Sequence, residues 1–254
     1  MILVIDVGNT NITLGLFKDG ELTQSWRLSS RVARTEDEIW VFMNMLVRGA
    51  HIELGDVVGI ALGSVVPSVT TSLLRLINKH LKARLVEVSS DLNLGITIKN
   101  VDPHTVGADR ICNAVAGFDR YGGPLAIVDF GTATTFDIIS KKGEYLGGII
   151  APGLESTALS LHHLAAKLPM VDLKFPDGVI GRSTEKSMQS GLMYGGADMV
   201  EGLLRRLRKE MGKKMRVIAT GGLAPALLPE LPSVEQIEPT LTLVGLYKIF
   251  QKNQ

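Results

Sequence analysis

The apolar and polar positions of the chain alternate between short strand-like runs and longer stretches with helical spacing. Three apolar runs separated by polar turns predict three strands over residues 1–28, and Asp19-Gly20 is a strong hairpin signal. A helix is predicted with Thr35 as its N-cap, because acidic residues and then apolar residues at helical spacing follow. The next predicted elements are a strand, a helix and a strand, at 57–67, 68–81 and 84–89. Strands that alternate with helices predict an α/β sheet whose inner strands are parallel.

The second half of the chain repeats this scheme. Its predicted elements are three hairpin-like strands over 125–150, a helix-rich segment over 153–211, a strand over 216–222 that ends on two glycines, and a closing helix over 240–250. Residues 102–123, between the halves, read as a loop, a helix and a Gly-rich turn. We place the boundary near residue 118, which predicts domains at 1–118 and 119–254, with the closing helix free to pack back on the first.

An internal repeat links the two halves. Moving residues 125–145 back by 123 positions brings five identical residues into register: Asp129 on Asp6, Gly131 on Gly8, Lys141 on Lys18, Gly143 on Gly20 and Glu144 on Glu21. The apolar pattern before each aspartate also matches. A period this long is too large for a solenoid, so it predicts two similar domains.

Each repeat places an aspartate and a small polar turn after its first apolar run. One reading is a plain hairpin turn, because Gly and Asn supply the positive φ of tight turns. The other is a phosphate site, in which backbone N–H groups converge on an anion. An acid beside a phosphate needs a cation between them, and Asp6 at the strand end suits Mg²⁺. Two such turns across a cleft would hold a polyphosphate, and Gly221-Gly222 would leave room for a flat base.

The composition is that of an ordinary globular protein and argues against several classes of function. Hydrophobic residues make up 45% and the net charge is +1, without the basic stripe of a nucleic-acid-binding protein. We interpret the basic segment Arg205–Lys214 as the solvated face of a helix. Cys112, the single cysteine, is expected in the core, and its lack of a disulfide partner fits a cytoplasmic, reducing compartment. We expect no signal peptide, membrane span or Cys/His metal cluster.

The motifs resemble those of a known enzyme family. A first phosphate turn, a second phosphate turn and a glycine-rich adenosine turn follow one another in the order of the actin-like ATPase superfamily. "VGADR" (Val106–Arg110), taken with "DVGNTN" and "DFGTATT", resembles the type III pantothenate kinases, and "GGIIAPG", "AAKLP" and "STEKSMQSGLMYG" agree. The resemblance covers essentially the whole chain. One departure is Asn100, at a place where family members often carry a tyrosine, so a contact to substrate or nucleotide would be missing.

This resemblance implies two tandem ribonuclease-H-like domains, with mixed sheets flanked by helices and a cleft between them. It implies a kinase that uses ATP to convert pantothenate to 4'-phosphopantothenate, the first step of coenzyme A biosynthesis. The implied cofactors are Mg²⁺ and a monovalent cation, K⁺ or NH₄⁺, and the implied assembly is a homodimer. From the residues alone, a sugar kinase, a polyphosphate-cleaving hydrolase or a non-catalytic regulator on the same scaffold remains an alternative.

The resemblance also assigns roles to individual residues. Asp109 would be the general base, although an aspartate there would equally suit a helix cap. Asp129 would hold the monovalent cation, and Thr184 would contact pantothenate from the partner subunit. The implied nucleotide contacts are Asp6, Val7, Gly8, Asn9, Thr10, Asn11, Ile12, Thr13 and Thr132. The implied substrate contacts are Gly107, Ala108, Asp109, Arg110 and Thr184.

Several of these positions have a purely structural alternative. Arg110 would donate to substrate or phosphate, or would pair with a neighbour. Lys18 would cover the phosphates, or would be an exposed hairpin lysine. Either Ser183 or Thr184 would cap the following helix. Thr132 and Thr134 would be phosphate donors, or would form cross-strand pairs of an ordinary sheet.

Overall fold

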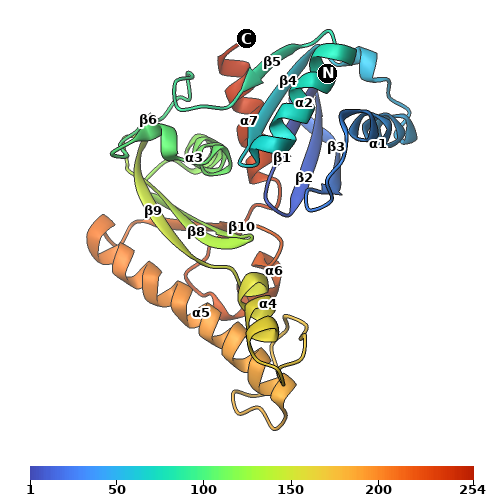
Figure 1. The fold of residues 1–254 in the computed structure, drawn as a ribbon. Coiled ribbons are helices and arrows are strands. Elements are labelled where there is room, and N and C mark those ends of the chain that lie inside the picture. The colour runs from blue at the N-terminus through green and yellow to red at the C-terminus, as the bar shows by residue number, and fades with distance from the viewer. The chain divides into compact units, whose positions relative to one another are not determined.

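The computed structural model describes residues 1–254, which divide into two compact units (Figure 1). The first unit contains Met1–Arg120 and Thr240–Gln254, and the second contains Tyr121–Pro239. The closing segment of the chain is therefore part of the first unit. None of the helices is both long enough and apolar enough to cross a membrane.

The first unit is built on a five-stranded mixed sheet in the order β3-β2-β1-β4-β5. An antiparallel meander is formed by β1 (Ile2–Val7), β2 (Asn11–Lys18) and β3 (Glu21–Ser29). Two parallel strands, β4 (Gly59–Ser64) and β5 (Arg84–Glu87), continue the sheet on the other side of β1. The helices are α1 (Glu36–Gly49), α2 (Pro67–His80), α3 (Ala108–Tyr121) and α7 (Leu241–Lys252). The short elements are 3-10 helices at Leu54–Asp56 and Pro103–Thr105 and the strand β6 (Thr97–Ile98). These elements confirm the strands and helices that the apolar pattern predicts here.

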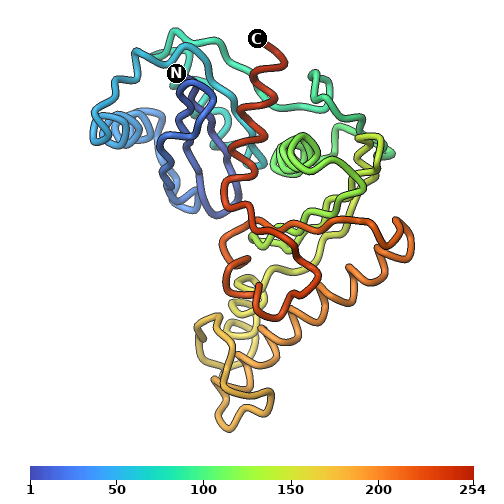
Figure 2. The backbone as a smooth tube through the Cα atoms, turned by 180° about the vertical axis from the view of Figure 1, so that it is seen from behind, coloured from blue at the N-terminus to red at the C-terminus, as the bar shows by residue number.

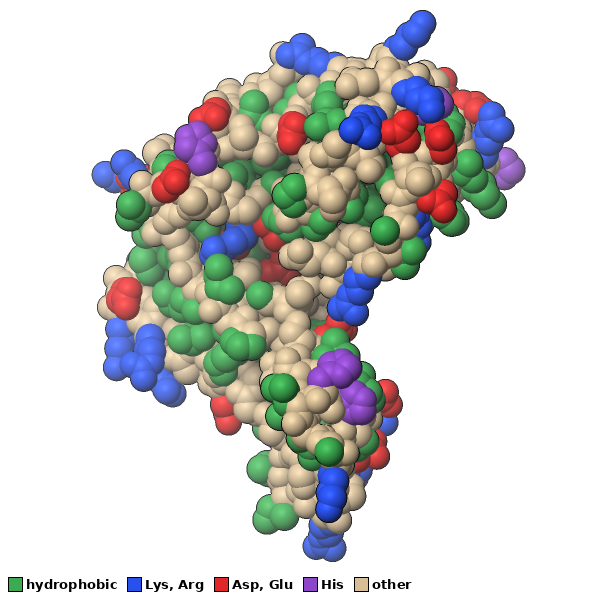
Figure 3. Space-filling model, in the orientation of Figure 1, with side chains coloured by type: hydrophobic (Ala, Val, Ile, Leu, Met, Phe, Trp, Pro, Cys, Tyr) green, Lys and Arg blue, Asp and Glu red, His purple; other side chains and the backbone are tan.

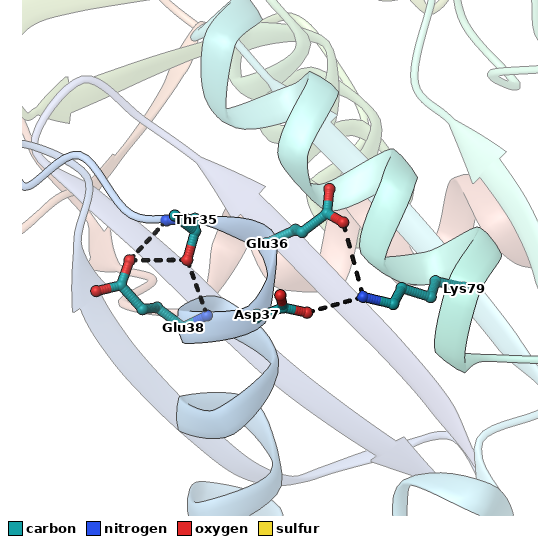
Figure 4. A network of polar contacts seen from close by, with 5 residues as sticks. All are labelled: Thr35, Glu36, Asp37, Glu38 and Lys79. Carbon is teal, nitrogen blue, oxygen red and sulfur yellow. Dashed lines mark hydrogen bonds and ion pairs between the residues drawn. The ribbon is translucent and has the colours of Figure 1, made fainter.

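One face of this sheet packs against α1 and α2. Alternate side chains of β1, namely Leu3, Ile5 and Val7, share a buried core with apolar residues of both helices. The predicted N-cap of α1 is confirmed: Thr35 Oγ1 accepts from the N–H of Glu38 at 3.3 Å, while Glu38 Oε2 accepts from the N–H of Thr35 at 2.7 Å. Figure 4 shows this reciprocal cap beside an ion pair in which Lys79 of α2 contacts Asp37 of α1 at 2.9 Å. The cap hydrogen bonds lower the pKa of the Glu38 carboxyl, and Lys79 lowers the pKa of Asp37.

The opposite face packs against α7 and the start of α3. Side chains alternate along a strand, so β4 presents only Gly59, Ala61 and Gly63 to this face. A Cβ at Gly59 would lie 2.1 Å from Cζ of Phe250 in α7, so the glycine is what allows the helix to approach. In Figure 2 the C-terminal helix, in red, runs along the blue N-terminal strands.

Helices α3 and α7 also approach each other closely. A Cβ at Gly245 would lie 2.1 Å from the carbonyl oxygen of Cys112 and 2.5 Å from its carbonyl carbon. Cys112 is fully buried, which confirms its prediction as a core residue. Thr242 donates a hydrogen bond at 2.8 Å to Oδ1 of Asn113, a buried polar side chain of α3. The position of α3 therefore depends on a helix formed by the last residues of the chain.

The second unit contains five strands in the order β11-β10-β7-β8-β9. An antiparallel meander is formed by β7 (Leu125–Phe130), β8 (Ala133–Ile139) and β9 (Glu144–Pro152). The strands β10 (Arg216–Thr220) and β11 (Gln236–Ile237) add in parallel beside β7. The helical elements are α4 (Leu154–Leu164), α5 (Thr184–Met211), α6 (Ala224–Leu227) and a 3-10 helix at Leu228–Glu230. Its core joins alternate residues of β7 with apolar residues of α5.

Both units begin with the same meander, but their turns differ in length. The turn between β1 and β2 holds residues 8–10, and its counterpart between β7 and β8 holds only 131–132. The turn between β2 and β3 holds residues 19–20, and its counterpart between β8 and β9 holds 140–143, because β8 starts one residue earlier than β2 in the repeat and is one residue shorter. These differences cancel, so Gly20 and Gly143 keep the repeat spacing and both have positive φ, 90° and 77°.

The helix-rich segment expected over 153–211 is not continuous. It consists of α4 and α5, separated by residues 165–183, which form no helix. The basic side chains Arg205, Arg206 and Lys209 are exposed on α5, and Figure 3 shows blue side chains gathered around the end of that helix. For the part of the basic segment that lies in α5, which ends at Met211, this confirms the interpretation as the solvated face of a helix.

Candidate active site

The first turn, residues 8–10, is fixed by a residue outside its own hairpin. The N–H of Gly8 donates to the carbonyl oxygen of Asn11 at 2.9 Å and closes the turn. Ser30, just after β3, donates its hydroxyl to the carbonyl oxygen of Gly8 at 2.7 Å and its N–H to that of Thr10 at 3.0 Å. Asn9 is exposed at the tip. The turn that carries the predicted nucleotide contacts is thus held in one conformation, with its tip open to solvent.

Asp6 lies at the end of β1, directly before this turn, and is half-buried. The strand register places it opposite Thr13 of β2 and Gly63 of β4. A Cβ at Gly63 would lie 3.6 Å from Cβ of Ala108 and 3.9 Å from Sγ of Cys112. The first turns of α3 therefore lie within contact distance of the end of β4, beside the end of β1. The structure therefore brings the "DVGNTN" and "VGADR" motifs together within the first unit.

The buried Cys112 thiol lies in the first unit with both predicted carboxylates. Burial raises the pKa of the Cys112 thiol well above its ordinary value, and the charges of Asp6 and Asp109 raise it further. The neutral thiol has no acid–base role at neutral pH, in agreement with its prediction as a core residue.

The "VGADR" motif forms the start of α3. Val106 and Ala108 are buried, whereas Asp109 and Arg110 are half-buried. Oδ1 of Asp109 accepts from the N–H of Arg110 at 2.9 Å, whereas an ordinary N-cap side chain accepts from an N–H two or three residues further on. A Cβ at Gly107 would lie 2.5 Å from that oxygen, so Gly107 provides the space that the carboxylate occupies. The motif therefore holds a half-buried carboxylate in a defined orientation.

The second turn, residues 131–132, is held by the start of α4. The N–H of Gly131 donates to the carbonyl oxygen of Ala133 at 3.1 Å. The carbonyl oxygen of Thr132 accepts the hydroxyl of Ser156 at 2.7 Å, and a Cβ at Gly153 would lie 2.3 Å from the same oxygen. Both Gly131 and Thr132 are exposed. As in the first unit, a neighbouring element fixes the backbone of a turn whose tip faces solvent.

Asp129 is half-buried at the end of β7 and lies against the glycine pair that follows β10. Gly221 has a φ of 92°, and a Cβ there would lie 2.6 Å from Oδ1 of Asp129 and 2.6 Å from the backbone nitrogen of Phe130. Gly222 has no atom within 4 Å of its own Cβ position. The two glycines therefore differ: Gly221 is required by Asp129 and β7, and only Gly222 faces open space.

The structure also distinguishes between the alternative roles of three positions: the N-cap of α5, Thr134 and Lys18. Ser183, not Thr184, is the N-cap of α5, because its Oγ accepts from the N–H of Lys186 at 3.2 Å, and Thr184 is the exposed first residue of that helix. Thr134 is only 2% exposed within β8, so it is a sheet residue and not a donor at the turn. Lys18 lies at the opposite end of β2 from the first turn, about 24 Å away at the usual rise per residue, and reads as an exposed hairpin lysine.

Each unit by itself carries the residue types that bind phosphate together with a cation. Each unit places one half-buried aspartate beside a fixed, solvent-facing turn, and the first unit adds Asp109. No group of three or more His, Cys, Asp or Glu side chains is arranged to hold a metal ion. The bracing residues Ser30, Gly63 and Ser156 were not identified from the sequence, since their roles depend on contacts between elements.

The sequence matches a known family over most of its length. Residues 2–206 match the family model described as type III pantothenate kinase. A curated relative from Thermomicrobium roseum, named type III pantothenate kinase, is 45% identical over 252 residues, which cover 99% of this chain and 97% of the relative.

Solved structures with lower identity share the fold. A protein from Campylobacter jejuni described as a conserved Baf family transcriptional activator has a TM-score of 0.60 at 21% identity, and the match covers 98% of this chain and 97% of that one. The activator of 2-hydroxyisocaproyl-CoA dehydratase from Clostridium difficile, with bound ADPNP, has a TM-score of 0.56 at 14% identity, covering 99% and 95%. A ROK family glucokinase from Streptomyces griseus, in complex with glucose and AMPPNP, has a TM-score of 0.56 at 14% identity, covering 99% and 100%. With the two mixed sheets flanked by helices, these likenesses confirm the two ribonuclease-H-like domains expected from the sequence.

Proposed function

Since the chain belongs to the type III pantothenate kinase family and is therefore a phosphotransferase that acts on pantothenate, we propose that its two turns and the start of α3 perform this reaction with ATP as phosphoryl donor. The observation that carries the proposal is the packing of α3 on the sheet: a Cβ at Gly63, which pairs with Asp6, would lie 3.6 Å from Cβ of Ala108, the neighbour of Asp109. A phosphate-binding turn and a candidate base are both needed for transfer to an alcohol, and here they belong to one packed unit.

The first turn binds the phosphates of ATP in this proposal. Its backbone N–H groups and the side chains of Asn9, Thr10 and Asn11 are the donors, and Ser30 keeps the turn preformed. Asp6 would hold Mg²⁺, and a single carboxylate suits an ion that also takes waters and phosphate oxygens. When bound, this ion would neutralise charge on the phosphates. Asp6 would thereby orient the nucleotide without forming a closed metal cage.

Asp109 is the general base of the proposed reaction. The primary hydroxyl oxygen of pantothenate forms a bond to the γ-phosphorus of ATP, the bond from that phosphorus to ADP breaks, and the hydroxyl proton passes to the Asp109 carboxylate. General-base assistance of this kind contributes roughly 10²- to 10⁴-fold to the rate. Arg110 is a guanidinium donor for the substrate or for the transferring phosphoryl group. Gly107 supports the role of Asp109, because it leaves the carboxylate room to face a substrate.

The second turn supplies the remaining contacts. Thr132 is exposed and its backbone is held by α4, which suits a donor to phosphate. Asp129, the repeat equivalent of Asp6, would hold a monovalent cation, K⁺ or NH₄⁺, since one Mg²⁺ needs few carboxylates. Thr184 would contact pantothenate from the second subunit of a homodimer. A cytoplasmic location is consistent with the single reduced cysteine.

The substitution Asp109→Asn tests the proposal. It removes the proton acceptor and keeps the size of the side chain, so kcat should fall at least about 100-fold while ATP binding persists. Asp119→Asn is the matched control, because Asp119 lies on the same helix and forms an ion pair with Lys248 at the surface. ATP turnover is measured with and without pantothenate. Turnover of Asp109→Asn close to that of the wild type would remove the base assignment, and equal ATP turnover without pantothenate would indicate a hydrolase.

A further inference from the structure

A segment of the second unit is tied to the first turns of α5 by a row of side-chain hydrogen bonds. We call residues 172–183 the strap. Each of these bonds runs from a side chain of α5 to a carbonyl oxygen of the strap: Gln189 to Asp172 at 3.1 Å, Tyr194 to Pro176 at 3.3 Å, Ser190 to Val179 at 2.5 Å and Ser187 to Gly181 at 3.2 Å. Three of the donors, at 187, 190 and 194, share one helix face.

The strap is part of the packed structure of this unit and not a loose loop. Leu173 and Phe175 pack against the core of the unit, and the Phe175 ring lies 5.0 Å from that of Tyr194. Gln189 is fully buried and Ser190 is 7% exposed, so these donors act away from water. A hydrogen bond of a buried side chain costs more to lose than one between exposed groups.

The strap reaches its closest approach to α5 next to Thr184. A Cβ at Gly181 would lie 2.2 Å from the backbone nitrogen of Ser187, so only a glycine fits there. Ser183, the last residue of the strap, caps the helix. Thr184 follows directly and is exposed. The direction of the Thr184 side chain is therefore set by a backbone that is fixed on both sides, by the strap and by the capped helix.

We propose that Ser190 and Gly181 are positioning residues for pantothenate binding, because they fix the strap and the strap fixes Thr184. This inference rests on the proposed contact between Thr184 and pantothenate. Neither residue touches the substrate. A binding group that is already oriented loses less freedom when the substrate arrives, and this lowers the concentration of substrate needed.

Kinetics of two strap variants test the inference. Ser190→Ala removes one buried hydrogen bond, and Gly181→Ala forces the strap away from the helix. The KM for pantothenate should rise about three- to tenfold in Ser190→Ala, the factor expected from one hydrogen bond, and further in Gly181→Ala. The KM for ATP should stay within twofold of the wild type, since the first turn is untouched. Thr71→Ala is the control: it also removes a hydroxyl that donates to a backbone carbonyl oxygen, but this hydroxyl lies at the exposed surface of α2 in the first unit.

Two further measurements separate the possible failures. Hydrogen exchange of the strap should be faster in Ser190→Ala, which shows directly whether the strap has been loosened. Thr184→Ala should raise the KM for pantothenate as well. If it does and both strap variants keep the wild-type KM, the positioning role is overturned and the role of Thr184 stands. If Thr184→Ala leaves the KM for pantothenate unchanged, the contact between Thr184 and pantothenate and the positioning role of the strap are both overturned. Equal rises of the two KM values in Ser190→Ala would indicate a general structural defect and also overturn the inference.

Discussion

Gly245 is the position where a single methyl group should damage both stability and catalysis. A Cβ there would lie 2.1 Å from the carbonyl oxygen of Cys112, about 1.3 Å short of the 3.4 Å at which ordinary van der Waals contact begins. The obstructing atoms belong to the backbone of α3, so no side-chain rotation relieves the overlap. Gly245→Ala must therefore move α7 away from α3.

The change in the free energy of unfolding of Gly245→Ala follows from two opposing effects. Alanine gains about 1 kcal/mol over glycine inside a helix. Overpacking of a well-packed interior costs about 1–3 kcal/mol and occasionally more, and an obstruction by backbone belongs at the upper end. We expect a net loss of about 2 kcal/mol in the free energy of unfolding. Since Asp109 lies one helical turn before Cys112, we also expect kcat to fall about 10- to 100-fold, because a displacement of about 1 Å can cost about 10²-fold.

Urea denaturation and steady-state kinetics measure both effects. Gly49→Ala, in α1 of the same unit, is the matched control, because a Cβ at Gly49 would meet nothing within 4 Å. It should be neutral or stabilise by at most about 1 kcal/mol. A Gly245→Ala protein as stable as the wild type, with the same kcat, would show that α3 and α7 do not pack as described.

Three further predictions concern the carboxylates and the thiol. In Asp6→Asn, higher concentrations of both ATP and Mg²⁺ should be needed to reach half of the maximal rate. If the rate depends on either concentration as in the wild type, Asp6 does not hold the metal. Replacing K⁺ by Na⁺ or choline at constant ionic strength should lower the rate of the wild type, and Asp129→Ala should abolish this difference between salts. Equal wild-type rates in the three salts would show that Asp129 holds no monovalent cation and instead binds Mg²⁺ or forms a structural hydrogen bond. Cys112 should resist thiol reagents in the folded protein and react after denaturation. Its raised pKa contributes stability that is fully present below about pH 8.5, the ordinary thiol value, and is lost as the pH rises above it, so unfolding should become easier in alkali.

The sequence predicted those parts of the fold that depend on neighbours along the chain. The three N-terminal strands, the cap at Thr35 and the closing helix all have local signals, in turn residues, capping residues and apolar spacing. The internal repeat predicted the second meander from the first. It could not predict the different turn lengths, because the insertions and deletions cancel and leave the spacing of identical residues unchanged.

The parts that the sequence did not predict depend on contacts between distant segments. Residues 165–183 lie within the segment predicted to be helix-rich, yet the strap forms no helix and is held by hydrogen bonds from buried side chains of α5. The support that Ser30 gives to the first turn becomes visible only when β3 returns beside it. Gly221 was expected to make room for a ligand, whereas its positive φ and its contact with Asp129 give it a structural reason.

The place of α7 in the first unit has a consequence for how the protein is made. The sheet of that unit begins at residue 2, but the helix that covers the small residues of β4 is made only after all of residues 121–239. Residues 121–239 form a compact unit of their own, so they have all their partners before the first unit does. Until α7 has been synthesised, the face of the N-terminal sheet that it covers is incompletely buried and has to be kept from other chains. A ribosome that stops within α7 would release a chain whose second unit is complete and whose first unit, which carries Asp6 and Asp109, is not.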